Sequence, residues 1–173
     1  CTFYHKIGAC RHGDKCSRRH VRPTESKSIL LANLYQDPRR ADPKAEPMLD
    51  EKFDRFYTDV FLKVAGLGEV DSIVVCENEN FHLTGNVYVR FRTMAMASDA
   101  MMALNQEWFG GRPVYCDLLP VANFHEANCR AHDTNSCTRG GLCNFMHVRR
   151  PSNEMRKRLK QAQEKTMVLA KIR

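Results

Sequence analysis

The stretch Thr84-Gly85-Asn86-Val87-Tyr88-Val89-Arg90-Phe91 decides how the middle of this chain folds. From residue 86 onward every second side chain is a large apolar one, which predicts a β-strand with one face on a core. The inward side chains would be Val87, Val89 and Phe91, and the outward ones Asn86, Tyr88 and Arg90. A strand needs partners for its backbone groups, so the flanking segments determine which sheet it joins.

The segments on either side of this strand complete the order β-α-β-β-α-β. Strands are predicted over 28–34, 70–76, 85–91 and 113–118, and helices over 48–65 and 94–104. In the first helix apolar residues recur at three- and four-residue steps, while Thr93 is a suitable N-cap for the second, whose expected buried face includes Met94. A polar hairpin loop through Asn78 and Asn80 joins the second and third strands. Two helices on one face of a four-stranded antiparallel sheet form an α+β domain with the fold of an RNA-recognition motif (RRM).

The outward face of this sheet lacks most of the aromatic side chains with which an RRM stacks RNA bases. The third strand of an RRM usually reads K/R-G-F/Y-G/A-F-V-x-F/Y, and this chain has Asn86 where an aromatic residue is expected. Leu30 replaces another on the first strand, so Tyr88 remains to stack a base. Each lost stack is worth about 1–3 kcal/mol. RNA binding by this sheet is therefore disfavoured, and the alternative is a sheet covered by another part of the chain.

Two sets of cysteines that each close with a histidine stand at the ends of the chain. The first reads C-x8-C-x5-C-x3-H and the second C-x7-C-x5-C-x3-H; their members are Cys1, Cys10, Cys16 and His20, and Cys129, Cys137, Cys143 and His147. Zn²⁺ prefers four thiolate and imidazole ligands in tetrahedral geometry, and a four-ligand set with no open position is a structural site. The spacing therefore predicts two small Cys₃His fingers, each holding one structural Zn²⁺.

A disulfide framework is the competing interpretation, because eight cysteines is an even number. No apolar secretory segment supports it. The remaining cysteines, Cys76 and Cys116, fall in predicted strands, where a small apolar side chain is a sufficient role.

The net charge of +7 is distributed unevenly along the chain. Residues 1–40 contain nine Lys and Arg against three Asp and Glu, and residues 129–173 contain eleven against three. Residues 41–128 are acidic, with seven Lys and Arg against fourteen Asp and Glu. Lys and Arg supply much of the affinity for nucleic-acid phosphates, so both ends would attract a polyanion that the middle repels. We therefore expect the fingers and the central domain to have different partners.

Several strings of sequence, together with this three-part layout, resemble the small subunit of the U2 snRNP auxiliary factor, a splicing-factor family that recognises the AG at the 3′ end of introns. The strings are Cys1-Thr2-Phe3-Tyr4, Lys6-Ile7-Gly8-Ala9-Cys10-Arg11-His12-Gly13-Asp14, Gly85-Asn86-Val87-Tyr88-Val89, Trp108-Phe109, Cys137-Thr138-Arg139-Gly140-Gly141 and Cys143-Asn144-Phe145-Met146-His147. The resemblance implies a nuclear protein of pre-mRNA splicing. It also implies that the central domain is a protein-binding variant of the RRM, the U2AF homology motif, which holds the large subunit of a heterodimer.

The predicted RNA contacts lie at fixed offsets from the metal ligands. Phe3 and Phe145 are expected to stack bases of single-stranded RNA. Arginines that can offer guanidinium groups to phosphate or to a guanine edge are Arg11, Arg18, Arg19, Arg130 and Arg139. Ser17 is small enough to let a base approach, and the resemblance implies that Ser17, Arg18 and Arg130 contact RNA. We expect both fingers to recognise one short AG-containing element jointly.

Trp108 stands in a polar run before two glycines, and we expect it to anchor a partner protein. The resemblance implies that Trp108 enters a proline-rich pocket of the large subunit and that Phe109 receives an aromatic side chain in return. It implies a partner role for Asp54 and Asp59 of the first predicted helix as well. Glu107 departs from the arginine that usually opens this family's Arg-x-Phe signature.

The end of the chain predicts a basic amphipathic helix with Ser152 as its N-cap. Its apolar stripe would comprise Met155, Leu159, Ala162, Thr166 and Leu169. The stripe could cover the sheet face, or the helix could stand detached on the surface. The predicted divisions are 1–27 for the first finger, 28–121 for the RRM-like domain, 122–149 for the second finger and 150–173 for this helix.

Two other function classes compete with a splicing-factor subunit. An RNA-binding regulator outside splicing would read A/U-rich elements without a large subunit, and a related splicing protein would act on another intron class. An enzyme is disfavoured because the sequence has no nucleophile motif, no paired carboxylates in a glycine-framed setting and no open metal position. No run approaches the roughly 18 apolar residues of a membrane span. Since the chain starts at a predicted ligand without methionine, we expect it to be a fragment of a longer protein.

Overall fold

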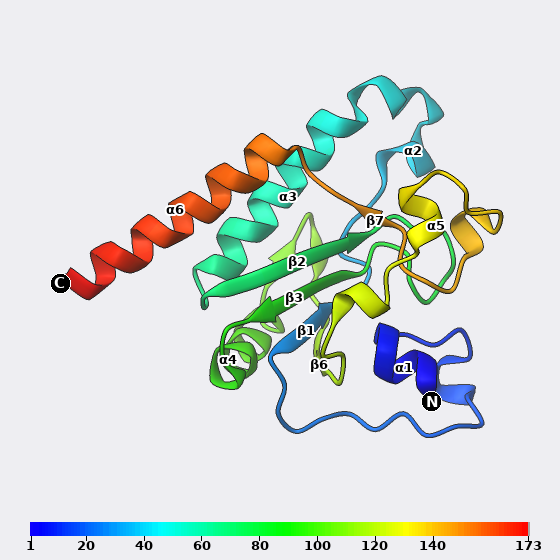
Figure 1. Cartoon of the computed structure of the whole chain (residues 1–173), viewed down its shortest axis with the longest axis horizontal. Coiled ribbons are helices and arrows are strands. Elements are labelled where there is room, and N and C mark those ends of the chain that lie inside the picture. Colours follow the sequence, from blue (N-terminus) through cyan, green and yellow to red (C-terminus); the bar gives the residue numbers. More distant parts are fainter. Residues whose placement is uncertain (173) are drawn as a thin grey trace.

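A computed structural model describes residues 1–172, and its central part has the predicted RRM fold with an added strand (Figure 1). The strands are β1 (Ser28–Leu31), β2 (Val70–Cys76), β3 (Val87–Phe91), β4 (Trp108–Phe109), β5 (Arg112–Pro113), β6 (Cys116–Leu119) and β7 (Val148–Arg149). The α-helices are α1 (Thr2–Ile7), α2 (Pro38–Ala41), α3 (Leu49–Ala65), α4 (Met94–Leu104), α5 (Arg130–Asp133) and α6 (Asn153–Ile172). Short 3-10 helices are η1 (Gly13–Lys15), η2 (Pro43–Met48), η3 (Phe124–Glu126) and η4 (Gly140–Leu142).

Within these residues the main sheet has the antiparallel order β6-β1-β3-β2-β7. Helices α3 and α4 cover one face, where Val87, Val89 and Phe91 are fully buried, so the predicted inward side of β3 is confirmed. The Thr93 hydroxyl accepts the Met96 amide at 3.2 Å, as expected of an N-cap. The predicted burial of Met94 is wrong, because this side chain opens α4 one turn before the first buried residue, Ala97, and is exposed.

The predicted strand 113–118 is divided in the structure. Pro113 pairs with Trp108 in the small β4–β5 hairpin, whereas Cys116–Leu119 forms β6 and pairs with β1. The Asn105 side chain at the end of α4 donates to the Cys116 carbonyl and accepts from its amide, both at 2.8 Å. These two bonds fix where β6 begins. Strand β7 was not predicted, because two residues after the second finger carry no readable period.

Helix α6 lies alongside α3, so both predicted placements of the C-terminal helix are wrong (Figure 1). Leu159 is buried in the same core as α3, and the Gln163 side chain bonds both the amide and the carbonyl of Val70 at 2.8 and 2.9 Å. The Ser152 hydroxyl accepts the Met155 amide at 3.2 Å, which confirms the N-cap. The far half of the stripe is exposed, including Leu169. The last predicted residue, 173, lies outside the described residues.

The other face of the sheet is covered by parts of both ends of the chain. Tyr88 and Asn86, expected to face outward, are 0% and 4% exposed. Their cover is a second apolar cluster that includes Ile7, Cys76, Leu83, Leu119, Val121, Ala127 and Met146. The alternative of a covered sheet is therefore confirmed, and the stacking role left to Tyr88 is wrong because its ring is inaccessible.

Gly8 explains how closely the first finger approaches this face. Its φ of +73° is a left-handed conformation that favours glycine, and it ends α1. A Cβ added there would lie 2.9 Å from Leu119 Cδ1 and 3.1 Å from Tyr88 Cε1. The buried Tyr88 hydroxyl accepts from the Asn86 side-chain amide at 3.2 Å, and burial raises the Tyr88 pKa well above its usual value.

Helices in the described part of the chain are too short or too polar to cross a membrane.

Candidate metal centres and RNA interface

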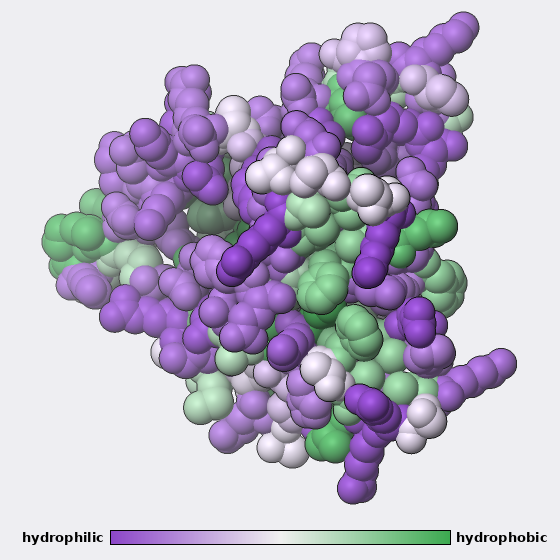
Figure 2. All heavy atoms as spheres, turned by 45° about the vertical axis from the view of Figure 1, so that its right-hand side comes forward, coloured by the Kyte–Doolittle hydropathy of each residue, from purple (hydrophilic) through white to green (hydrophobic). Residues whose placement is uncertain are grey.

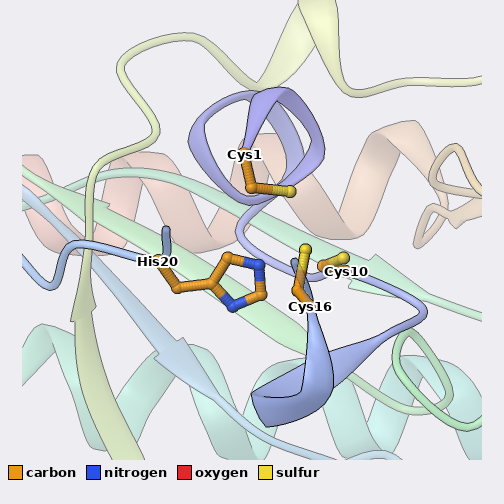
Figure 3. Close-up of side chains that lie close together, drawn as sticks. All are labelled: Cys1, Cys10, Cys16 and His20. Carbon is orange, nitrogen blue, oxygen red and sulfur yellow. The ribbon is translucent and has the colours of Figure 1, made fainter. Parts of the chain in front are cut away.

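The ligand atoms of the first predicted set converge, as Figure 3 shows for Cys1, Cys10, Cys16 and His20. All four lie within 4.8 Å of one another. Helix α1 starts directly after Cys1, and the Cys1 backbone nitrogen donates to the Arg19 carbonyl at 2.9 Å, which brings the two ends of the finger together. The Tyr4 ring stacks on His20 with centroids 4.7 Å apart and so orients this imidazole.

The second set converges in the same way, with the ligand atoms of Cys129, Cys137, Cys143 and His147 within 4.8 Å. The Cys143 and Cys129 sulfurs are 3.9 Å apart, far longer than the roughly 2 Å of a disulfide bond. His132 stacks on His147 with centroids 4.0 Å apart, and its Nε2 lies 3.0 Å from a Glu77 carboxylate oxygen. Residues outside the ligand set thus hold the imidazole in place.

The donor atoms in both clusters fit a zinc ion. His20 Nε2 and His147 Nε2 are buried and have no hydrogen-bond partner within residues 1–172, as expected of nitrogens that serve as ligands. Thiolates with one imidazole are a donor set that Zn²⁺ prefers. Cys76 and Cys116 stay apart from the clusters in β2 and β6, where burial raises the pKa of Cys116 to about 12 and that of Cys76 further. Both predicted sets are therefore brought together by the fold.

The β2–β3 loop holds the second finger by hydrogen bonds to the backbone of that finger. The sequence did not reveal this role. Asn78 is 1% exposed, and its side-chain amide donates to the carbonyls of Cys143 and Phe145 at 3.1 and 2.9 Å. Its side-chain oxygen accepts the His147 amide at 2.8 Å. The Glu79 amide donates to the Gly141 carbonyl at 2.8 Å. The second finger and the sheet are consequently one packed unit.

The two fingers meet at Phe3 and Phe145, the residues predicted to stack bases. Their ring centroids are 6.4 Å apart with an interplanar angle of 62°, an edge-to-face contact. Phe3 is 42% exposed and Phe145 36% exposed, so each ring keeps an accessible part. Figure 2 turns the side of the molecule that carries the fingers forward and shows an apolar strip between hydrophilic margins.

The residues predicted to make polar contacts with RNA lie on the surface of the two fingers. Arg11, Arg18, Arg19, Arg130, Arg139 and Ser17 are all exposed. Phe81, which was not predicted, is 98% exposed between Asn80 and His82 in the loop that holds the second finger. A lone large apolar residue in a polar loop was the signal that could have identified it.

The predicted partner residues divide into two places. Trp108 is 70% exposed on the β4–β5 hairpin, beside a small apolar pocket that Phe109 lines, and the Phe109 ring packs edge-on against Phe56 at 5.8 Å. Glu107 forms an ion pair with Lys63 of α3 beside this pocket, and Asp59 is exposed one turn before Lys63. Asp54 points elsewhere, because its carboxylate accepts the Ser152 amide at 3.3 Å.

The architecture defines a class of protein, in which two Cys₃His clusters are packed on one RRM-like sheet. No family model matches the chain. It is 49% identical over 173 residues to the splicing factor U2AF 23 kDa subunit of Schizosaccharomyces pombe, covering 98% of this chain and 80% of that protein. The chain therefore belongs to the family of U2AF small subunits, and it is a splicing factor.

Other relatives agree. The identity is 46% over 170 residues to the splicing factor U2af 38 kDa subunit of Drosophila melanogaster, covering 92% of this chain and 64% of that protein. It is 44% over 168 residues to the U2AF 26 kDa subunit of Bos taurus, covering 92% and 76%. Among solved structures, an RRM of Rna15 with bound RNA (GU) aligns with a TM-score of 0.36 and 14% identity over 64% of this chain and 95% of that one, a likeness too low to carry an argument.

Proposed function

We propose that the two fingers of this splicing factor jointly bind single-stranded RNA at the AG of the 3′ splice site, in the nucleus, while its central domain binds the large subunit of a heterodimer. The observation that carries the proposal is the contact between Phe3 and Phe145. Each finger contributes one ring, so a strand that stacks on both must touch both fingers. Neither finger alone would then be sufficient.

Each finger would hold one structural Zn²⁺ through its three cysteines and its histidine. Fingers of this size cannot bury a core of their own, and zinc supplies about 10–16 kcal/mol in finger peptides. The ion would fix helix α1, which carries Phe3, and the loops that carry Arg18 and Phe145. A preordered loop loses less conformational entropy when RNA binds, which favours affinity.

Charge and aromatic surface together suit a single RNA strand. Stacking on a ring is tolerant of sequence, whereas guanidinium groups can pair with the guanine edge of AG. Arg18 and Arg139 are exposed on finger loops and Arg130 at the start of α5, all in the basic parts of the chain. We therefore assign stacking to the phenylalanines, and base and phosphate contacts to the arginines.

The test of this proposal is fluorescence-anisotropy binding of the zinc-loaded protein to two short RNAs that differ only in an AG or CG dinucleotide. We expect the AG RNA to bind at least about fivefold more tightly, because one wrong base typically costs about 1–3 kcal/mol. A parallel titration with and without a large-subunit peptide shows whether the preference needs the partner. Equal affinity for both RNAs in the presence of the peptide would contradict the proposal and favour a regulator outside splicing.

The partner surface is proposed at the β4–β5 hairpin. Changing Trp108→Ala should weaken binding of a tryptophan- and proline-containing large-subunit peptide by about 2 kcal/mol or more, roughly 30-fold in Kd, because exposed tryptophans that enter a pocket are typical hot spots. Isothermal titration calorimetry measures the effect. Tyr115→Ala is the matched control, since Tyr115 is a similarly exposed aromatic at 68% against 70%. Equal loss in both variants would exclude a specific role for Trp108.

A further inference from the structure

A polar groove of about 410 Å³ lies on the part of the sheet face that the fingers leave open. Its floor is formed by Ser72 and Val74 of β2 and Arg90 of β3. One wall is η3, with Phe124 and His125, and the other is the segment 148–151 with Arg156 of α6. The groove therefore occupies a surface that an ordinary RRM offers to RNA.

Arginine dominates the charged lining of this groove, where Asp71 is the acidic counterpart within the described residues. Two of the arginines serve the fold. Arg149 pairs with the exposed Asp50 and with the largely buried Glu77, and Arg90 bonds the Ala122 carbonyl. Arg90 also pairs with Asp71 at 3.5 Å, so both arginines carry carboxylate partners; they shape the groove but add little net positive charge to it.

The other two arginines are available to a ligand. Arg156 is exposed and contacts the Asn153 side chain at 3.2 Å. Arg150 pairs with Asp133 at 3.0 Å, but both side chains are partly exposed at 48% and 30%, so water screens this pair and an incoming phosphate can compete for it. The positive charge that the groove offers to a ligand therefore comes mainly from Arg150 and Arg156, whose guanidinium groups can reach a phosphate.

The groove is continuous with the fingers. Helix η3, which forms one wall, packs against α1 of the first finger. Asn128, also in the lining, forms a parallel bridge with Met146 of the second finger.

We propose that this groove binds the sugar–phosphate backbone of the single-stranded RNA that flanks the dinucleotide held by the fingers. The inference rests on the proposed function, because it needs an RNA strand that leaves the fingers. It assigns the open sheet face to phosphate contact without base reading, since Tyr88 is buried and the charged groups suit a polyanion. Flanking RNA of any sequence should then add affinity.

The test compares a short AG RNA with the same RNA extended by about six uridines on either side. Two extended RNAs are used, one lengthened on the 5′ side and one on the 3′ side. Wild-type protein should bind one of these two RNAs about tenfold more tightly than the short RNA. The double variant Arg150→Gln/Arg156→Gln should lose this gain. The slope of log Kd against log salt should also fall by about 1.4, because each lost phosphate contact on a single strand contributes about 0.7 to the slope. Its affinity for the short RNA should be unchanged, and Arg150→Lys/Arg156→Lys should keep most of the gain.

Lys157→Gln/Arg158→Gln is the matched control, because it removes the same charge from exposed positions of α6 outside the groove lining. An equal loss in this control would overturn the inference and assign the effect to general charge. Extended RNAs that bind wild type no better than the short RNA would overturn it too, while the proposed function stands. A short RNA bound without AG preference would instead reject the proposed function. The double variant is also tested for binding of a phosphoserine peptide. If it loses affinity for this peptide but keeps its affinity for extended RNA, the groove belongs to a protein partner.

Discussion

Replacing Cys143→Ser should release one of the two proposed Zn²⁺ ions and unfold the second finger. Cys143 is 2% exposed, and serine is a poor ligand for Zn²⁺. The damage should spread to the sheet, because the Cys143 carbonyl accepts from the side chains of both Asn78 and Asn80. A buried amide that loses its partners costs about 1–3 kcal/mol. We therefore expect the free energy of unfolding to fall by at least about 3 kcal/mol.

Zinc content by mass spectrometry and urea denaturation followed by circular dichroism measure the two parts of this result. The matched control is Cys116→Ala, which also removes a buried thiol but lies in β6, outside both clusters. It should keep two zinc ions per chain and cost about 1 kcal/mol. A Cys143→Ser protein that retained both ions and wild-type stability would show that the cluster is not a structural metal site.

The second large effect concerns the two rings between the fingers. Phe3→Ala and Phe145→Ala should each weaken binding to the AG RNA by about 1–3 kcal/mol, the usual value of one base stack. The centroids of the two rings are 6.4 Å apart, so removing one ring also takes away a contact that holds the other ring in place. The double variant should therefore lose less than the sum of the single losses, by about 0.5–1.5 kcal/mol.

Anisotropy titrations of the four proteins give this double-mutant cycle directly. Tyr115→Ala again serves as an exposed aromatic control and should leave RNA affinity unchanged. Thermal melts should be close to wild type for Phe3→Ala, since this side chain is 42% exposed. Strictly additive losses would mean that the two fingers bind RNA independently, and no loss in either single variant would exclude both rings from the interface.

The sequence predicted those parts of the fold that depend on local pattern. Helix α3 begins one residue from its predicted start because its apolar side chains repeat at helical steps, and β2 has its predicted bounds. The ligand sets were readable because zinc constrains residues that are close along the chain. The alternation in β3 correctly separated its two faces, although it could not say what covers the outer one.

The remaining features depend on contacts between distant residues. Tyr88 and Asn86 have the polarity of an exposed face, yet they satisfy each other by a hydrogen bond beneath the first finger. Asn78 looks like an ordinary loop residue, and its role appears only when the second finger folds over it. Gln163 docks α6 through two bonds to the backbone of Val70 at the start of β2, which an apolar stripe cannot predict.

The packing of the first finger on the sheet affects how the protein folds during its synthesis. Ile7 and Gly8 dock against Tyr88 and Leu119, which follow them by roughly 80 and 110 residues in the chain. Ribosomes add about 5–20 residues per second, so this surface is completed roughly 5–20 seconds after the first finger has been synthesised. During that interval the finger can bind its metal, but Ile7 has no apolar surface to cover it. The second finger is made after the sheet and meets a finished loop, so chaperone protection should be needed at the beginning of the chain rather than at its end.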